Sequence, residues 1–300
     1  MTYRTVMAAF VAALHLATCV AQENNPAFQA RRAFRAAEKK LDWQIAVAAY
    51  SFRQFTFFET VDKVAELGVD QIEGFNFQKI SEETPGPLNP FTMSDEDFEK
   101  VRRKVRQSGI TLIALYYGSF PADEAACRKV FAGSKRLGVK YFVSEPAPAQ
   151  LPMLDKLAQE YGMIVGLHGH DKKSSPNTWH PGLVAKHCQG FSPSIGAFSD
   201  TGHWIRSELD PSEGVSLLKD RVVGFEIHDL HAFNASGHDV PLGTGVGKLQ
   251  KMLETVAKVK KGPVLFSIEY TSNPDHPSDD VKKCLEFLDA QAVRLANLAR

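Results

Sequence analysis

A repeating unit of helix, glycine and apolar strand constrains the fold of this chain more than any other feature. Gly68, Gly109, Gly138 and Gly162 each follow an amphipathic stretch and precede an apolar run, as expected where a helix ends and a strand begins. The runs expected to form strands are 44–50, 69–74, 110–117, 139–145, 163–168, 195–200, 222–228 and 263–269. Eight strands that alternate with helices predict a single (β/α)8 TIM barrel. A doubly wound open sheet is the alternative, but no glycine-rich phosphate fingerprint follows the first strand.

Length and charge agree with one barrel. The chain has 300 residues, and barrels of about 250 residues fold as one unit. Lysine plus arginine and aspartate plus glutamate number 35 each, so the net charge is zero. Proteins that bind nucleic acid carry a basic surface, which this balance does not predict. We therefore expect one barrel over 44–300 and no nucleic-acid partner.

The first 21 residues have the pattern of a secretory signal peptide. Arg4 precedes a short apolar run that ends on small residues, and cleavage is expected after Ala21. Residues 16–19 also resemble a lipoprotein signal in which Cys19 would carry the lipid, and a helical extension is a third interpretation. Residues 22–43 are interpreted as a leader helix, and no later segment is long and apolar enough to span a membrane. The expected location is periplasmic or extracellular, with a lipid anchor as the alternative.

Acidic and imidazole side chains stand where six of the predicted strands end. They are Glu73, Glu145, His168, Asp200, His228 and Glu269. In a (β/α)8 barrel these strand ends converge on the catalytic face. A single strand-end carboxylate is most often solvated, but four ligands in matching positions favour a shared site. The four proposed metal ligands are Glu145, Asp200, His228 and Glu269. Three carboxylates and one imidazole suit one divalent ion, with Mn²⁺ favoured and Mg²⁺, Co²⁺ or Zn²⁺ as alternatives.

Phrases at these strand ends resemble the xylose isomerase-like TIM barrel superfamily, in its sugar-phosphate isomerase/epimerase branch. They are Tyr141-Phe-Val-Ser-Glu-Pro146, Phe198-Ser-Asp-Thr-Gly-His-Trp204, Gly224-Phe-Glu-Ile-His-Asp229 and Phe266-Ser-Ile-Glu269. The resemblance implies that the four proposed ligands bind one metal ion. It also implies that Glu145 and Glu269 face opposite sides of a sugar and exchange protons with its carbon. A carboxylate can act as the base while the ion stabilises the enediolate that remains.

Three further residues are candidates for substrate binding. They are His203, His168 and Glu73. His203 follows Asp200 by three residues and could instead orient that carboxylate. For His168 a metal role is the alternative, and Glu73 matches a position where the family often carries an acid. Tyr50 and Tyr116 could form an apolar wall for a sugar ring, although core packing is the favoured interpretation.

The predicted function is a divalent-metal-dependent isomerase or epimerase that acts on a sugar or keto-sugar through an enediolate. The first alternative is an elimination by a 3-keto-glycoside lyase or hydrolase. A metallo-phosphoesterase of the endonuclease branch is disfavoured by the balanced charge, and a non-catalytic secreted binding protein is disfavoured by the complete ligand set. The expected partner is a small-molecule sugar or glycoside, and an oligomer remains open.

Overall fold

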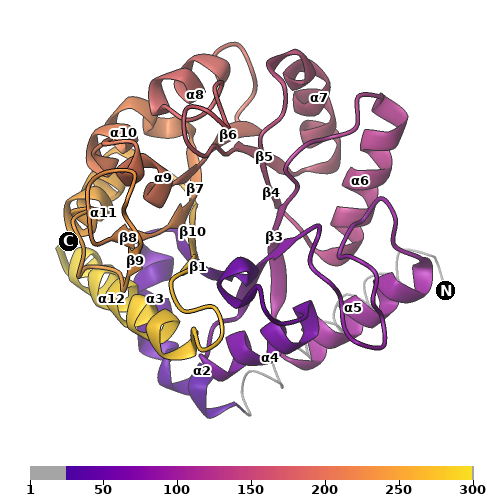
Figure 1. The fold of residues 1–300 in the computed structure, drawn as a ribbon, viewed down its shortest axis with the longest axis horizontal. Coiled ribbons are helices and arrows are strands. Elements are labelled where there is room, and N and C mark those ends of the chain that lie inside the picture. The colour runs from indigo at the N-terminus through magenta and orange to yellow at the C-terminus, as the bar shows by residue number, and fades with distance from the viewer. Residues whose placement is uncertain (1–24, 299–300) are drawn as a thin grey trace.

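Eight parallel strands form a closed barrel in the computed structural model, which describes residues 25–298 (Figure 1). The strands are β1 (Trp43–Ala48), β2 (Gln71–Phe75), β3 (Thr111–Tyr116), β4 (Tyr141–Ser144), β5 (Ile164–Leu167), β6 (Ile195–Asp200), β7 (Val222–Ile227) and β10 (Val264–Ile268). Their hydrogen-bonded order is β1-β10-β7-β6-β5-β4-β3-β2, and β2 pairs with β1 to close the ring. The predicted (β/α)8 barrel is confirmed.

Helices surround the barrel on its outer side (Figure 1). The α-helices are α2 (Pro26–Ala30), α3 (Arg32–Lys40), α4 (Phe57–Glu66), α5 (Asp95–Gln107), α6 (Glu124–Leu137), α7 (Leu151–Tyr161), α8 (Pro181–His187), α9 (Thr201–Arg206), α10 (Pro211–Leu218), α11 (Leu249–Val259) and α12 (Ser278–Leu298). Short 3-10 turns are η1 (Ala49–Phe52), η2 (Pro148–Gln150) and η3 (Lys219–Arg221). The short helix α9 and a hairpin of β8 (Asp229–Leu230) with β9 (Asp239–Val240) lie outside the predicted alternation, and both contribute to the site described below.

The local signals that predict the helix ends are present in the structure. Gly138 and Gly162 cap α6 and α7 with φ angles of +92° and +67°, a conformation that residues with a Cβ rarely adopt. At the other end, Ser94 caps α5 by accepting a hydrogen bond from the backbone N–H of Asp97. The two glycine caps end α6 and α7 shortly before β4 and β5 begin.

Phe198 fills part of the barrel interior beneath the site, in one buried cluster with Tyr141 and Leu265. Phe198 is fully buried on β6, and glycines on the two neighbouring strands leave room for its ring. A Cβ atom at Gly224 would lie 2.4 Å from this ring, and one at Gly166 would lie 2.5 Å from the Phe198 Cβ. Two residues further along β5, β6 and β7, inward positions fall at 168, 200 and 226, because side chains alternate across a strand. The packed interior thus forms a floor for the polar residues above it.

The N-terminal helices are attached to the end of the chain by a buried ion pair. Arg31 binds both carboxylate oxygens of Asp289 on α12, with distances of 3.0 Å from Nε and 2.6 Å from Nη2. Its Nη2 also lies 2.8 Å from Glu38. The predicted leader helix is thus two short helices from residue 26 to 40, and the predicted signal peptide at 1–21 lies outside the described residues.

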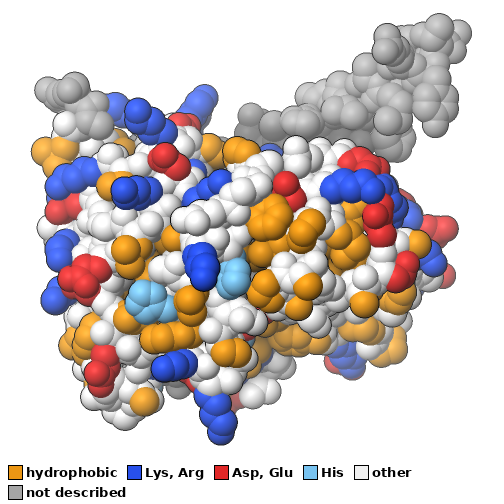
Figure 2. Space-filling model, turned by 90° about the horizontal axis from the view of Figure 1, so that it is seen from above, with side chains coloured by type: hydrophobic (Ala, Val, Ile, Leu, Met, Phe, Trp, Pro, Cys, Tyr) orange, Lys and Arg blue, Asp and Glu red, His pale blue; other side chains and the backbone are white. Residues whose placement is uncertain are grey.

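The outer surface carries both signs of charge. Basic and acidic side chains are interspersed on the side of the molecule drawn in Figure 2, in agreement with the balanced composition. Within residues 25–298, no helix is both long and apolar enough to cross a membrane.

Candidate active site

A cavity of about 480 Å³ lies where the barrel strands end, within the size range of small-molecule sites. Five of the seven predicted site residues line it: His168, Asp200, His203, His228 and Glu269. The other lining residues are Tyr50, Arg53, Phe75, Phe77, Tyr116, His170, Arg206, Glu226 and Thr271. Two of the predicted site residues, Glu145 and Glu73, do not line the cavity.

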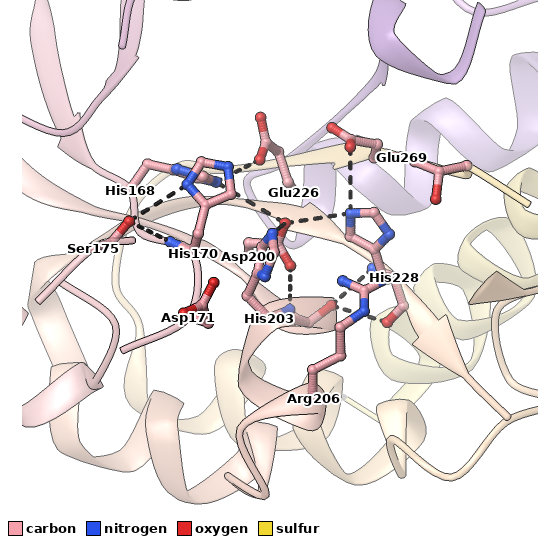
Figure 3. A network of polar contacts seen from close by, with 12 residues as sticks. His168, His170, Asp171, Ser175, Asp200, His203, Arg206, Glu226, His228 and Glu269 are labelled. Carbon is pink, nitrogen blue, oxygen red and sulfur yellow. Dashed lines mark hydrogen bonds and ion pairs between the residues drawn. The ribbon is translucent and has the colours of Figure 1, made fainter. Parts of the chain in front are cut away.

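Asp200 lies between two imidazoles at the centre of the site (Figure 3). It ends β6 and caps α9, where its Oδ1 accepts a hydrogen bond of 2.7 Å from the backbone N–H of His203. Its Oδ2 lies 3.4 Å from His228 Nε2 and 4.0 Å from His168 Nε2. Burial opposes ionisation, but the imidazoles of His228, His203 and His168 together outweigh it and hold the pKa of Asp200 well below its usual range. Asp200 is therefore an ionised, buried carboxylate.

His228 follows β7 and is held from behind by Asp239 on β9. Its Nδ1 lies 3.0 Å from Asp239 Oδ1, while Asp239 Oδ2 accepts bonds from the backbone and hydroxyl of Thr271. The pKa of Asp239 is lowered despite its burial, so Asp239 accepts and the Nδ1 of His228 carries the proton. Nε2 lies 3.8 Å from Glu269 Oε1 and has no hydrogen-bond partner in the described part of the chain. A metal-binding imidazole in proteins is commonly oriented in this way.

His168 follows β5 and repeats this arrangement with Glu145. Its Nδ1 lies 3.2 Å from Glu145 Oε1, and its Nε2 lies 2.7 Å from Glu226 Oε2 without making a well-aligned hydrogen bond. Burial lowers the pKa of His168, but Glu226, Glu145 and Asp200 raise it further, so the net pKa is well above the usual value. The carboxylates of Glu226 and Asp200 near His168 Nε2 therefore stabilise a positive charge at this position, which either a proton or a metal ion can supply.

Glu145 is enclosed by other side chains. Oε1 lies 2.7 Å from His170 Nδ1 and 3.3 Å from the Tyr116 hydroxyl, in addition to its contact with His168. The Ser175 hydroxyl donates to Oε2. Burial raises the pKa of Glu145, but the histidines lower it more, so this carboxylate is ionised. Both of its oxygens contact neighbouring side chains.

Glu226 is a site residue that the sequence reasoning missed. It lines the cavity from β7, two residues before His228, and its Oε1 has no hydrogen-bond partner among the described residues. The signal was available, because positions 226 and 228 of one strand share a face. Glu73, predicted to contact substrate, is instead 0% exposed beside Glu226. Burial and Glu226 raise the pKa of Glu73 well above its usual range, so it is a neutral acid beneath the cavity.

Glu269 and His203 complete the polar wall. Burial and the nearby Glu226 raise the pKa of Glu269 well above its usual range. Burial also lowers the pKa of His203 to about 4, against the effect of Asp200, so this imidazole is neutral near neutral pH. Its Nε2 lies 3.8 Å from Asp200 Oδ2, and its ring lies 4.6 Å from that of His170.

Three of the four predicted metal ligands meet in this cavity, and the fourth does not. Asp200 and Glu269 both approach His228 Nε2, whereas Glu145 lies behind His168. Potential ligand atoms within 4.8 Å of one another form two sets among the described residues. The sets are His168, Asp200 and Glu226, and Glu145, His168 and His170.

Comparison with known proteins identifies similar solved structures. No family model and no curated protein matches the chain. An uncharacterized protein from Parabacteroides distasonis ATCC 8503 is 28% identical, with a TM-score of 0.65, over 82% of this chain and 98% of that one. A D-psicose 3-epimerase is 13% identical, with a TM-score of 0.65, over 83% and 99%. The IOLI protein with a zinc atom is 14% identical, with a TM-score of 0.64, over 84% and 99%. These likenesses show that the chain shares its fold with these proteins, as the resemblance to the xylose isomerase-like barrels predicts.

Proposed function

We propose that this protein is a divalent-metal-dependent isomerase or epimerase of a sugar or keto-sugar. The observation that carries the proposal is the pair of histidines, His168 and His228, in one cavity. In each, a carboxylate holds Nδ1, and Nε2 is without a hydrogen-bond partner within residues 25–298. Each Nε2 faces carboxylate oxygens, 2.7 Å away at Glu226 for His168 and 3.4 Å away at Asp200 for His228, and imidazole nitrogens with carboxylates form a donor set that a divalent ion binds.

The side chains of the cavity fit a divalent ion. Asp200, His228 and Glu269 would hold it, with His168 as the fourth ligand in place of Glu145. Two imidazoles and two carboxylates suit Mn²⁺, Co²⁺ or Zn²⁺ better than Mg²⁺, which prefers oxygen ligands. The zinc atom named for the IOLI protein supports a divalent ion in this fold, and Mn²⁺ is the first ion to test.

Proton transfer would fall to carboxylates of the cavity wall. Glu269 keeps the role predicted for it, whereas Glu145 is occupied by its hydrogen bonds. We assign the second proton-transfer role to Glu226, which lines the same cavity. The metal ion, when bound, would polarise a substrate carbonyl and its neighbouring hydroxyl. The neutral imidazole of His203 can hold a substrate hydroxyl, and the sugar epimerases of the same fold support a sugar as substrate.

Elimination from a 3-keto-glycoside is the second candidate, and one observation favours it. An epimerase that inverts a carbon needs proton-transfer groups on opposite faces of the substrate, whereas an elimination does not. An elimination needs one base and one acid for the leaving group. Glu226 and Glu269 lie on the same side of Asp200 in Figure 3 and could serve in those two roles.

Metal analysis and solvent exchange test the proposed function. The Mn²⁺-loaded protein is incubated in D₂O with D-fructose, D-psicose and L-ribulose, and separately with a 3-keto-glycoside. We expect about one ion per chain and deuterium at a carbon next to the carbonyl, and we expect Glu269→Gln to abolish that exchange. Release of an aglycone without epimer formation would favour elimination. A metal-free protein without exchange on any of these sugars would overturn the proposal.

We also propose that the protein is exported, from the signal-like pattern of residues 1–21. Mass spectrometry of the mature protein tests this. A chain that begins at Gln22, or at a lipidated Cys19, is the expected result. A mature protein that retains Met1 would contradict export by this route.

A further inference from the structure

We propose that a second subsite beside the candidate active site binds an additional sugar ring, so that the substrate is a glycosylated sugar rather than a free monosaccharide. This inference rests on the proposed function, in which the first cavity holds the reacting sugar. The second cavity, of about 540 Å³, lies around η1 and the loop after β2. It shares Tyr50, Arg53, Phe75 and Phe77 with the first cavity. A ligand can therefore extend from one cavity into the other.

An aromatic cluster forms the boundary between the two cavities. Phe77 is 58% exposed, and its ring centroid lies 5.6 Å from that of Phe75 and 6.2 Å from those of Tyr50 and Tyr116. A solitary exposed phenylalanine is common on protein surfaces. This one differs because three rings support it and both cavities include it. An exposed, supported aromatic face offers apolar contact to the C–H face of a sugar ring.

Two unpaired polar groups favour a ligand that carries hydroxyls. The amide of Gln78 is fixed by bonds of 3.2 Å from Nε2 to Phe55 O and Thr60 Oγ1. Its Oε1 has no hydrogen-bond partner in the described chain, although Gln78 is only 8% exposed and lines the second cavity. Arg53 lines both cavities and donates from Nη2 to Thr271 O, while its Nη1 is unpaired among the same residues. Both atoms lie buried in the cavity wall, where a sugar hydroxyl that reached them would donate to the first group and accept from the second.

The charges around the second cavity favour a neutral ligand. Lys79 and Glu82 form an ion pair of 2.6 Å at its rim. Glu59 is engaged by Thr56 in the cap of α4, and Arg53 is the remaining cation of the wall. Two acidic and two basic side chains leave no excess charge for a phosphate or a carboxylate group. A neutral second sugar ring fits the aromatic face, the unpaired groups and the charge balance together.

Calorimetric titration of the Mn²⁺-loaded protein tests the subsite. The probes are D-fructose and three disaccharides that carry a second ring on fructose: turanose, lactulose and isomaltulose. We expect at least one disaccharide to bind about tenfold more tightly than D-fructose, as one aromatic contact can provide. Phe77→Ala should abolish this gain, so that the variant binds the disaccharides no more tightly than D-fructose. Phe91→Ala is the matched control, because Phe91 is 44% exposed but lines neither cavity.

The possible failures separate the subsite from the proposed function. Equal binding of D-fructose and all three disaccharides, no binding of any probe, or a gain that survives in Phe77→Ala would overturn the subsite. Repeating the titration after metal removal addresses the active site. Loss of D-fructose affinity without the ion supports the proposed function whatever Phe77→Ala does. A gain that depends on Phe77 but not on the metal ion would support the subsite and count against the metal-dependent site.

Discussion

The ends of β4 and β7 resemble each other in the sequence but have different surroundings in the fold. Each apolar run is followed by an ionisable residue, Glu145 after β4 and His228 after β7. His228 lines the cavity, its Nε2 makes no hydrogen bond within residues 25–298, and Asp239 supports it from behind. Glu145 is itself a supporting residue, because it holds His168 and does not line the cavity. A residue at a strand end can therefore be a ligand or the support of a ligand.

The two supported histidines are equivalent in geometry and differ in the source of their carboxylates. His168 takes its partner from the neighbouring strand end, whereas His228 takes its partner from the β8–β9 hairpin. If both histidines bind one ion, removal of either carboxylate should weaken metal binding by a similar factor. The following predictions test this equivalence.

The largest effect is expected from His228→Ala. Loss of a ligand should lower the affinity for Mn²⁺ by more than about 100-fold, the upper end of what loss of a supporting residue costs. Equilibrium dialysis with metal analysis measures the change, and circular dichroism of the metal-free protein checks that the fold remains. Unchanged affinity in a folded variant would remove His228 from the site.

A smaller loss is expected when the supporting carboxylates are neutralised. Glu145→Gln and Asp239→Asn form a matched pair, since each leaves its histidine in place without an ionised acceptor. Each should lower the Mn²⁺ affinity by about 10- to 100-fold. A loss for Glu145→Gln as large as for His228→Ala would restore Glu145 to the ligand set that the sequence predicts.

The sequence predicts the barrel well because its signals are local. Glycine caps and apolar runs depend only on neighbouring residues, and both recur in several units. The grouping of Asp200, His228 and Glu269 also follows from the order of strands, since β6, β7 and β10 are adjacent. The role of Glu145 could not be read in this way. The order of strands places His168 beside Glu145, but only the side-chain positions show that the Glu145 oxygens contact residues after β5 and do not line the cavity.

Two other site residues, Asp239 and Glu226, differ in how far the sequence predicts them. Asp239 comes from a hairpin that has no strand-end pattern, so nothing in its neighbourhood marks it as the support of His228. Glu226 stands inside an apolar run, where the rule of alternation places it on the inward face with His228. The sequence alone therefore predicts the inward position of Glu226, whereas the role of Asp239 can be identified only from the tertiary structure.

Metal binding should weaken as the pH falls. Burial lowers the pKa values of His168 and His228, but their carboxylate neighbours raise them further, to a net position well above 6.5. In the metal-free protein, this protonation contributes stability that is full below about pH 6.5 and is lost as the pH rises through the raised pKa values. Binding an ion must displace these protons, so the affinity should rise by about tenfold per pH unit for each proton released.

Thermal unfolding with and without Mn²⁺ at pH 6, 7 and 8 measures this linkage. The increase in melting temperature on adding the ion should grow from pH 6 to pH 8. An increase that is the same at all three values would show that no histidine proton is displaced, and would count against both imidazoles as ligands. Asp239→Asn serves as the control, because it should reduce the pH dependence that arises from His228.

The smallest effect is expected from Ser175→Ala. The Ser175 hydroxyl donates to Glu145 Oε2 and accepts from the backbone N–H of His170, so its loss should lower the free energy of unfolding by about 1–2 kcal/mol. His168 and His170 would still hold Oε1, and the Mn²⁺ affinity should therefore change only a few-fold. Urea denaturation and dialysis measure the two quantities, with exposed Ser174→Ala as the control. If Ser175→Ala weakened metal binding as much as Glu145→Gln, the orientation of this carboxylate would depend on the serine, and the support of His168 would extend to the loop after β5.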